Sequence, residues 1–312
     1  MNIKKIGLTA LAGSLVATSA FAGAMSVSGG ASLNVEHTNG GAGDTGKTFS
    51  MGNQLTFSGS GELDNGLNVA LSFIIDQNDD GTTASGAVNS ANTGTPFDSH
   101  SVTVSSDALG SLKFSGEGGS SATSALDTTA AGDIWDNFDG STTVHPTGIG
   151  GGDNSMLYTL PTLMDGLSAN ISYNKTSEGA ESATGYSVTY TGMEGLSLSY
   201  GSGDGTTANT SADVIKASYA YGPVTLAYSN YEYDADGTSS DDDTTSYKVS
   251  YTVSDEISLS YGSETVSRGT KIDGEYTSIS ASYTAGGMTI SAAMQEAENM
   301  DGTTTATQDR ER

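Results

Sequence analysis

Cysteine is absent from the 312 residues, and proline occurs only four times. Without cysteine, the chain has no disulfide framework and no thiolate metal site or nucleophile. Few prolines beside 42 glycines suit a chain with many tight turns and few rigid kinks. Basic residues are also scarce, with 11 lysines and arginines against 37 acidic residues. This balance argues against nucleic acid as a partner, and it suits either the handling of cations or solvated acidic loops.

A long apolar run is missing as well. The N-terminal run that starts at Ile6 has twelve residues, fewer than the roughly 20 that span a bilayer as a helix. Two lysines precede it, and a small-x-small sequence follows at residues 20–22. We therefore expect residues 1–22 to be a cleaved Sec signal peptide and residues 23–312 to form the mature protein, with an N-terminal anchor as the alternative. The mature chain loses two lysines and no acid, which takes the net charge from −26 to −28.

Apolar side chains recur at every second position through most of the remaining chain. On a β-strand such residues point to one face and the polar residues between them point to the other. A soluble sandwich would alternate in the same way, so this pattern predicts strands without placing them in a membrane. The clearest segments are 25–35, 49–57, 67–75, 167–173, 215–221, 247–253, 257–261 and 288–294.

The connections between these strands alternate between short and long. Short connections with turn-forming residues lie at 64–66, 106–108, 161–166, 192–195, 222–223, 254–255 and 285–287. Long connections rich in Asp, Gly, Thr and Ser lie near 37–48, 77–98, 119–153, 175–183, 202–212, 232–245, 267–275 and 295–306. Sorting short turns to one side and long loops to the other is typical of outer-membrane proteins, in which the long loops face outward.

The predicted fold class is therefore all-β, a transmembrane antiparallel up-and-down β-barrel. Closure into a barrel leaves no unpaired strand edge in hydrocarbon. Fifteen strands can be counted up to Glu298, and a sixteenth is expected near Ala306. Fourteen and eighteen strands are the alternatives. Many of the 15 tyrosines, Tyr231 among them, stand near strand ends, as in an aromatic girdle or through ordinary strand propensity.

Two segments carry a resemblance to a known family. Residues 55–67 and residues 153–161, followed by Asp165-Gly166-Leu167, resemble hairpins of the general porins of alphaproteobacteria, such as those of Rhodobacter. The resemblance covers roughly residues 23–312. It implies a 16-stranded barrel, a homotrimer, and a third long loop folded into the pore. Family members end on a strand that finishes in an aromatic residue, whereas this sequence stops at Arg312. We expect a truncated last strand, with closure by another route as the alternative.

The loop at 119–153 is the one that the resemblance places inside the barrel. It carries four aspartates around two aromatic residues that could anchor it to the wall, Trp135 and Phe138. We expect its carboxylates to face the passage, together with acidic residues of the neighbouring strands; an outward, solvated loop is the alternative. The predicted acidic constriction consists of Asp127, Asp133, Asp136, Asp139, Glu117 and Glu62.

Basic residues at polar strand positions would form the opposite wall. The alternation of apolar and polar positions places four of them on the polar face, namely Lys113, Lys216, Lys248 and Arg268. A basic wall opposite an acidic loop creates a transverse field that orients polar solutes. Since carboxylates outnumber these four bases, we expect a preference for cations.

Metal and catalytic sites have weaker signals. Asp76, Asn78 and Asp80 reproduce the first half of a calcium loop, but position twelve is Ala87 instead of Glu, so only weak external Ca²⁺ binding is considered, with solvated loops as the alternative. The three histidines lie in no catalytic motif, and we expect neither an enzyme nor any other cofactor.

The sequence thus predicts passive diffusion of small hydrophilic solutes and ions across the outer membrane of a Gram-negative bacterium, in contact with lipid and lipopolysaccharide. The alternatives are a secreted, calcium-coated surface or adhesin protein and a substrate-specific outer-membrane channel.

Overall fold

The computed structural model describes residues 25–38, 46–76, 97–138, 149–175, 181–235, 241–285, 288–300, 302 and 310–311. The predicted signal peptide lies outside these residues. Within these ranges the chain forms sixteen strands and two short 3-10 helices, η2 (Ser124–Leu126) and η3 (Ile134–Asn137). Neither these helices nor any other helical segment in the described ranges has the length and apolarity to cross a bilayer.

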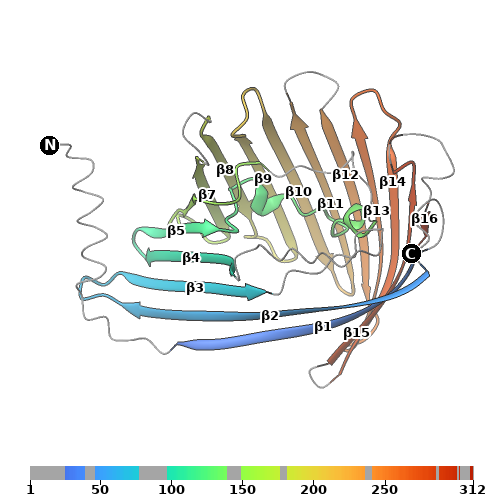
Figure 1. Cartoon of the computed structure of the whole chain (residues 1–312), viewed down its shortest axis with the longest axis horizontal. Helices are drawn as coiled ribbons and strands as arrows, with labels where there is room; N and C mark the ends of the chain where they lie inside the picture. The colour runs from blue at the N-terminus through green and yellow to red at the C-terminus, as the bar shows by residue number, and fades with distance from the viewer. Residues whose placement is uncertain are drawn as a thin grey trace, which may run out of the picture.

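The strands follow one another along the chain (Figure 1). They are β1 (Ser26–Thr38), β2 (Gly46–Glu62), β3 (Asn68–Asp76), β4 (Phe97–Ser106), β5 (Gly110–Glu117), β6 (Ser155–Thr159), β7 (Leu167–Asn174), β8 (Ala183–Tyr190), β9 (Leu196–Asp204), β10 (Ser211–Tyr221), β11 (Val224–Asp234), β12 (Asp242–Thr252), β13 (Ile257–Arg268), β14 (Gly274–Ala285), β15 (Met288–Glu298) and β16 (Arg310–Glu311).

Each strand pairs antiparallel with the next, so one sheet runs in order from β1 to β16. This confirms the predicted all-β, antiparallel up-and-down fold. The expected sixteenth strand is represented by the two residues of β16, which pair only with Glu296 and Ala297. Figure 1 shows the sheet as a strongly curved surface. Among the described residues, the ladder has no pair that joins β1 to β16.

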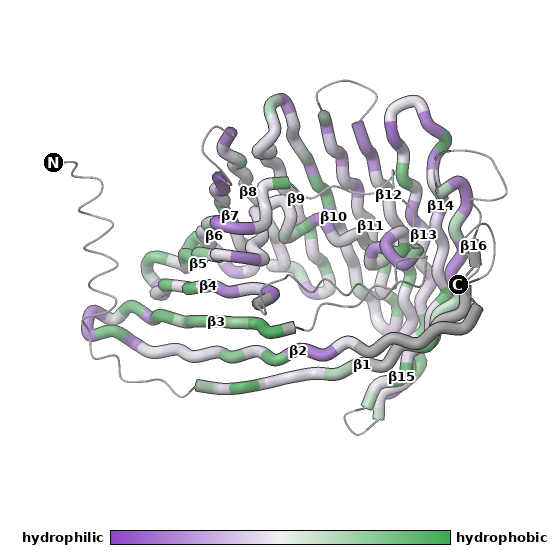
Figure 2. Tube along the Cα trace, in the orientation of Figure 1, coloured by the Kyte–Doolittle hydropathy of each residue, from purple (hydrophilic) through white to green (hydrophobic). Residues whose placement is uncertain are grey.

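The two faces of the sheet differ in chemistry, as the alternation predicts. Large apolar side chains stand exposed on one face, including Leu55, Leu71, Ile171, Ile215, Leu226, Val249, Ile279 and Ile290. Green and pale residues accordingly alternate along the strands in Figure 2. The other face carries hydroxyl side chains that hydrogen-bond between neighbouring strands. The Oγ atoms of Ser26 and Ser58 lie 2.7 Å apart, and Thr189 Oγ1 lies 2.9 Å from Ser199 Oγ. The apolar face is the one that suits hydrocarbon, and the hydroxyl face suits water.

The short connections that the structure describes form tight turns at one end of the sheet. At the β2–β3 turn, the N–H of Gly66 donates to the carbonyl of Leu63 at 2.8 Å. Gly66 has a φ of +79°, which glycine adopts without steric cost. The long connections all leave the opposite strand ends, which confirms the predicted sorting.

Candidate functional site

The longest described connection, between β5 and β6, begins at a β-bulge. Ser115 pairs with Ser101 and Glu117 pairs with His100, so Gly116 is the extra residue. A Cβ on Gly116 would lie 2.0 Å from His100 Nε2, which explains why glycine occupies this position. The bulge corrects one prediction. Glu117 turns to the face of His100, its carboxylate 3.9 Å from His100 Nδ1, and this is also the outward face of Phe73.

The two ends of the loop are tied together at a neck. The N–H of Gly119 donates to the carbonyl of Gly152 at 3.1 Å, and the N–H of Gly152 donates back at 2.5 Å. A Cβ on Gly119 would collide with Ser155 Oγ at 1.9 Å. The neck brings both ends of the loop together beside β6.

The first part of the loop, residues 121–127, lies against the inner face of β7–β11. The N–H of Ala122 donates to Ser172 Oγ on β7 at 2.9 Å. Ser121 Oγ donates to the carbonyl of Ile149 in the returning part of the loop at 2.6 Å. Ile149 and Leu126 pack with the inward side chains Ala212, Val214 and Tyr231. The loop therefore folds inward, as predicted.

The second part, residues 128–138, crosses successive strands of the inner wall. Lys216 Nζ on β10 donates to the carbonyl of Thr128 at 2.5 Å. The N–H of Ala130 donates to Ser229 Oγ on β11 at 2.8 Å, and the N–H of Ala131 donates to Ser246 Oγ on β12 at 2.9 Å. The loop backbone thus follows the wall across β10, β11 and β12.

Glu264 on β13 continues this row, and its side chain is buried at 1% exposure. Its Oε2 accepts the N–H of Trp135 at 3.1 Å, and its Oε1 accepts the hydroxyl of Thr129. Glu264 is a functional residue that the alternating pattern alone does not distinguish from other polar strand residues.

An apolar cluster fixes the end of the second part. Ile134 and Phe138 are buried among Val266, Tyr276, Ala297 and Met300, and Trp135 packs against them. The Phe138 and Tyr276 rings lie 6.0 Å apart. Both predicted anchors thus lie against the wall, with Phe138 the more buried of the two.

The predicted acidic residues have different environments. Asp133 Oδ1 accepts the N–H of Thr129 at 2.8 Å, so this carboxylate shapes the loop itself. Asp136 is exposed and Asp127 is half-buried. Burial, and to a smaller extent the neighbouring charge of Asp133, raises the pKa of Asp127 above its ordinary value. Asp139 lies outside the described residues.

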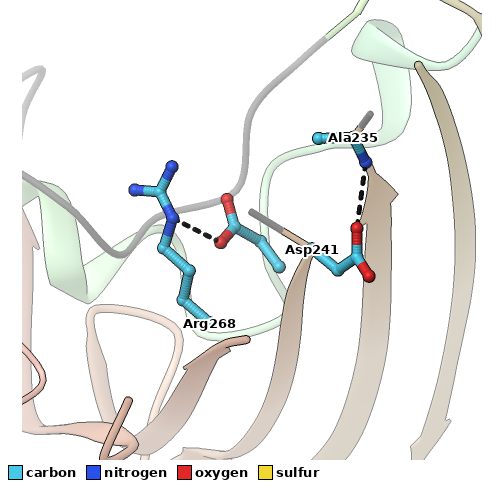
Figure 3. A network of polar contacts seen from close by, with 4 residues as sticks. Ala235, Asp241 and Arg268 are labelled. Carbon is cyan, nitrogen blue, oxygen red and sulfur yellow. Dashed lines mark hydrogen bonds and ion pairs between the residues drawn. The ribbon is translucent and has the colours of Figure 1, made fainter. Parts of the chain in front are cut away.

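The predicted basic wall divides into two kinds of residue. Lys216 is bound to the loop, and Arg268 Nε lies 3.2 Å from Asp242 Oδ1 at the start of β12. Figure 3 shows Arg268 in this ion pair, beside the bond of 3.1 Å from the N–H of Ala235 to Asp241. Lys113 is exposed and Lys248 is half-buried on the inner face.

The remaining predicted residues lie away from the loop. Glu62 ends β2 beside the short turn and pairs with Asn68, so the structure places it at the turn end of the sheet. Of the calcium candidates, Asn78 and Asp80 lie outside the described residues, and Asp76 ends β3. Among the residues that the structure describes, no three His, Asp or Glu side chains gather in a way that could hold a metal ion.

The part of the inner wall that holds the loop, which we call the loop seat, is marked by a pattern in the sequence. Val214, Tyr231, Val266 and Tyr276 are apolar side chains at inward positions, where the alternation calls for polar ones, and all four are buried. Tyr231 therefore belongs to the loop seat and not to an outward girdle. Such exceptions to alternation, grouped on β10, β11, β13 and β14, mark the part of the wall that the loop covers.

Comparisons with known proteins agree with this architecture. The sequence model described as Gram-negative porin matches residues 7–271. Two solved structures of mutants of the Rhodopseudomonas blastica porin superpose with a TM-score of 0.67 each, at 13% and 14% identity. Each alignment covers 92% of this chain and 97% of the other. The search of curated proteins returned no match.

Proposed function

Because the chain belongs to the Gram-negative porin family, an outer-membrane channel family and not an enzyme class, we propose that it conducts small hydrophilic solutes passively and prefers cations. The observation that carries this proposal is the inward loop between β5 and β6, which lies along the hydroxyl-lined face of the sheet. A polar wall narrowed by a loop selects solutes by size and charge.

The cation preference follows from which charges are already compensated. Lys216 feels the negative charges of Asp133 and Asp127 and donates to the loop backbone, and Arg268 is paired with Asp242. Of the predicted bases, this leaves Lys113 and Lys248 on the inner face, in a chain whose 37 acidic residues outnumber its 11 lysines and arginines. A negative local potential concentrates cations in the passage.

Conductance recordings test the channel function. Purified protein in a planar bilayer is expected to give stepwise, ohmic currents that grow in proportion to salt concentration, and liposomes containing it are expected to swell in small sugars. Heat-unfolded protein is the control. A folded protein that gives neither response contradicts the proposal.

Export and assembly are part of the same proposal. We propose that the chain is cleaved after Ala22 and assembles as a homotrimer in contact with lipopolysaccharide. N-terminal sequencing of the membrane-extracted protein should begin at Gly23, and cross-linking in mild detergent should give a band of three subunits. A start at Met1, or a strictly monomeric band, would count against these points.

A further inference from the structure

We infer that Glu264 is a positioning residue, which holds the constriction loop against the inner wall and so sets the cross-section of the passage. The inference deepens the proposed channel function and rests on it. Glu264 acts at the end of a row of wall residues that bind the loop backbone.

The row is built by the register of four neighbouring strands. Lys216 pairs with Ser229, Ser229 pairs with Ser246, and Ser246 pairs with Glu264. Directly paired residues on one face lie side by side across a sheet. The row therefore presents one donor and three acceptors at the same level of the wall, and the loop backbone meets each of them in turn.

Glu264 makes two bonds to the loop, whereas each of the other three residues of the row makes one. A carboxylate accepts hydrogen bonds about twice as strong as those to neutral groups, and Glu264 accepts two from the loop. The Thr129 hydroxyl oxygen itself accepts the N–H groups of Gly132 at 3.1 Å and Asp133 at 2.8 Å. Its hydrogen therefore goes to Glu264, and the pair fixes the turn that carries Asp133 and Trp135.

Glutamine cannot replace this carboxylate without loss. One of its two terminal groups is an NH₂ donor, so either the Thr129 hydroxyl or the Trp135 N–H would lose its acceptor. A buried donor left without a partner is costly. Glu264→Gln therefore removes one of the two bonds to the loop and the negative charge that strengthens the other, with little change in side-chain volume.

The wall beside Glu264 is shaped to receive the loop. Gly262 lies two residues before Glu264, and a Cβ there would come within 2.9 Å of Ala131 Cβ and 3.2 Å of Ile134 Cδ1. The absent side chain leaves room for the loop. A larger residue such as valine would push the loop away from the wall and into the passage.

Trp135, the only tryptophan in the chain, reports on the loop directly. In Glu264→Gln and Glu264→Ala, its emission is expected to move to longer wavelength and to be quenched more by acrylamide. Loss of two charge-assisted bonds is expected to raise the ratio of released to seated loop by roughly 10- to 100-fold. Thr129→Val should act in the same direction. Glu275→Gln is the matched control, because Glu275 is exposed on the outward face of β14.

Single-channel currents of the same variants complete the test. Channels with Glu264→Gln should flicker to lower conductance levels, and Gly262→Val should give a steady lower conductance. Gel mobility shifts on heating establish that each variant is folded, and Thr129→Val substitutes for any Glu264 variant that does not fold. If wild type conducts while Glu264→Gln and Thr129→Val keep its emission, quenching and steady current, the inference is wrong. If folded wild type does not conduct, the proposed function is wrong. The fluorescence of Trp135 still tests whether Glu264 holds the loop against the wall.

Discussion

The backbone N–H of Trp135 donates to Glu264 Oε2 at 3.1 Å, across 129 residues of sequence. This bond joins the loop after β5 to a strand near the other end of the sheet. A loop tied to distant strands in this way cannot drift without breaking contacts at β10, β11, β12 and β13. The seat of the loop is thus a property of the folded sheet and not of the loop sequence alone.

Phe138 is expected to be the main apolar anchor of the loop. Replacing a buried phenylalanine with alanine costs about 3–5 kcal/mol, and Phe138 is 3% exposed in its cluster. Phe138→Ala should therefore loosen the loop, seen as faster protease cleavage and red-shifted Trp135 emission. Phe114→Ala, at an outward position with 37% exposure, should change neither readout. Equal cleavage of the two variants would contradict the anchor.

The half-buried carboxyl of Asp127 predicts a pH dependence of selectivity. Since burial raises the pKa of Asp127, this group becomes neutral at a higher pH than an ordinary aspartate does as the solution is acidified. As the solution is acidified, cation preference should therefore begin to fall at a higher pH in wild type than in Asp127→Asn. Permeability ratios measured across a pH series test this. Identical pH profiles of the two proteins would exclude Asp127 as the titrating group.

The raised pKa of Asp127 also determines how this residue contributes to folding stability at different pH values. A carboxyl whose pKa is raised by folding stabilises the folded chain at low pH, and this contribution is lost as the pH rises through the folded-state pKa. Asp127→Asn is therefore not expected to lower the unfolding temperature at neutral pH. A marked drop at neutral pH would show that the ionised carboxylate is needed for the fold.

Glu117 and Asp127 should differ in their effect on permeation. The bulge turns Glu117 toward His100 on the outward face, whereas Asp127 lies on the inward loop. Glu117→Gln should leave the permeability ratio unchanged, and Asp127→Asn should lower the preference for cations at neutral pH. A larger effect of Glu117→Gln would contradict the register at the bulge.

Arg268 is expected to stabilise the loop end of β12 and β13. Asp242 keeps only 3% of its side chain exposed beside Arg268, and removing the cation from such a pair should cost about 1–3 kcal/mol, allowing for the partial exposure of Arg268. Arg268→Ala should therefore lower the temperature at which the heat-modifiable band converts on a gel. Lys271→Ala, an exposed neighbour, serves as the control. Matching transitions would contradict a stabilising pair.

Alternation and loop sorting were sufficient to predict the strands and their order, because both depend on local sequence. They missed Glu264, Ser229 and Ser246, since these residues fit the polar face like any other polar strand residue. Their role depends on which strands lie beside the loop, and that is set by register over long distances. The strict alternation also failed at Glu117, where the extra Gly116 turns the last side chain of β5 to the other face.

Reversal potential in asymmetric KCl is the most direct measurement of the central claim. Wild-type protein in a planar bilayer, with a salt gradient and neutral pH, should give stepwise currents. The sign of their reversal potential should be that of a pore that prefers potassium over chloride. Asp127→Asn with Asp136→Asn should move that potential toward zero. An anion-selective sign in wild type would contradict the acidic passage, and a complete lack of conductance by folded protein would contradict the channel itself.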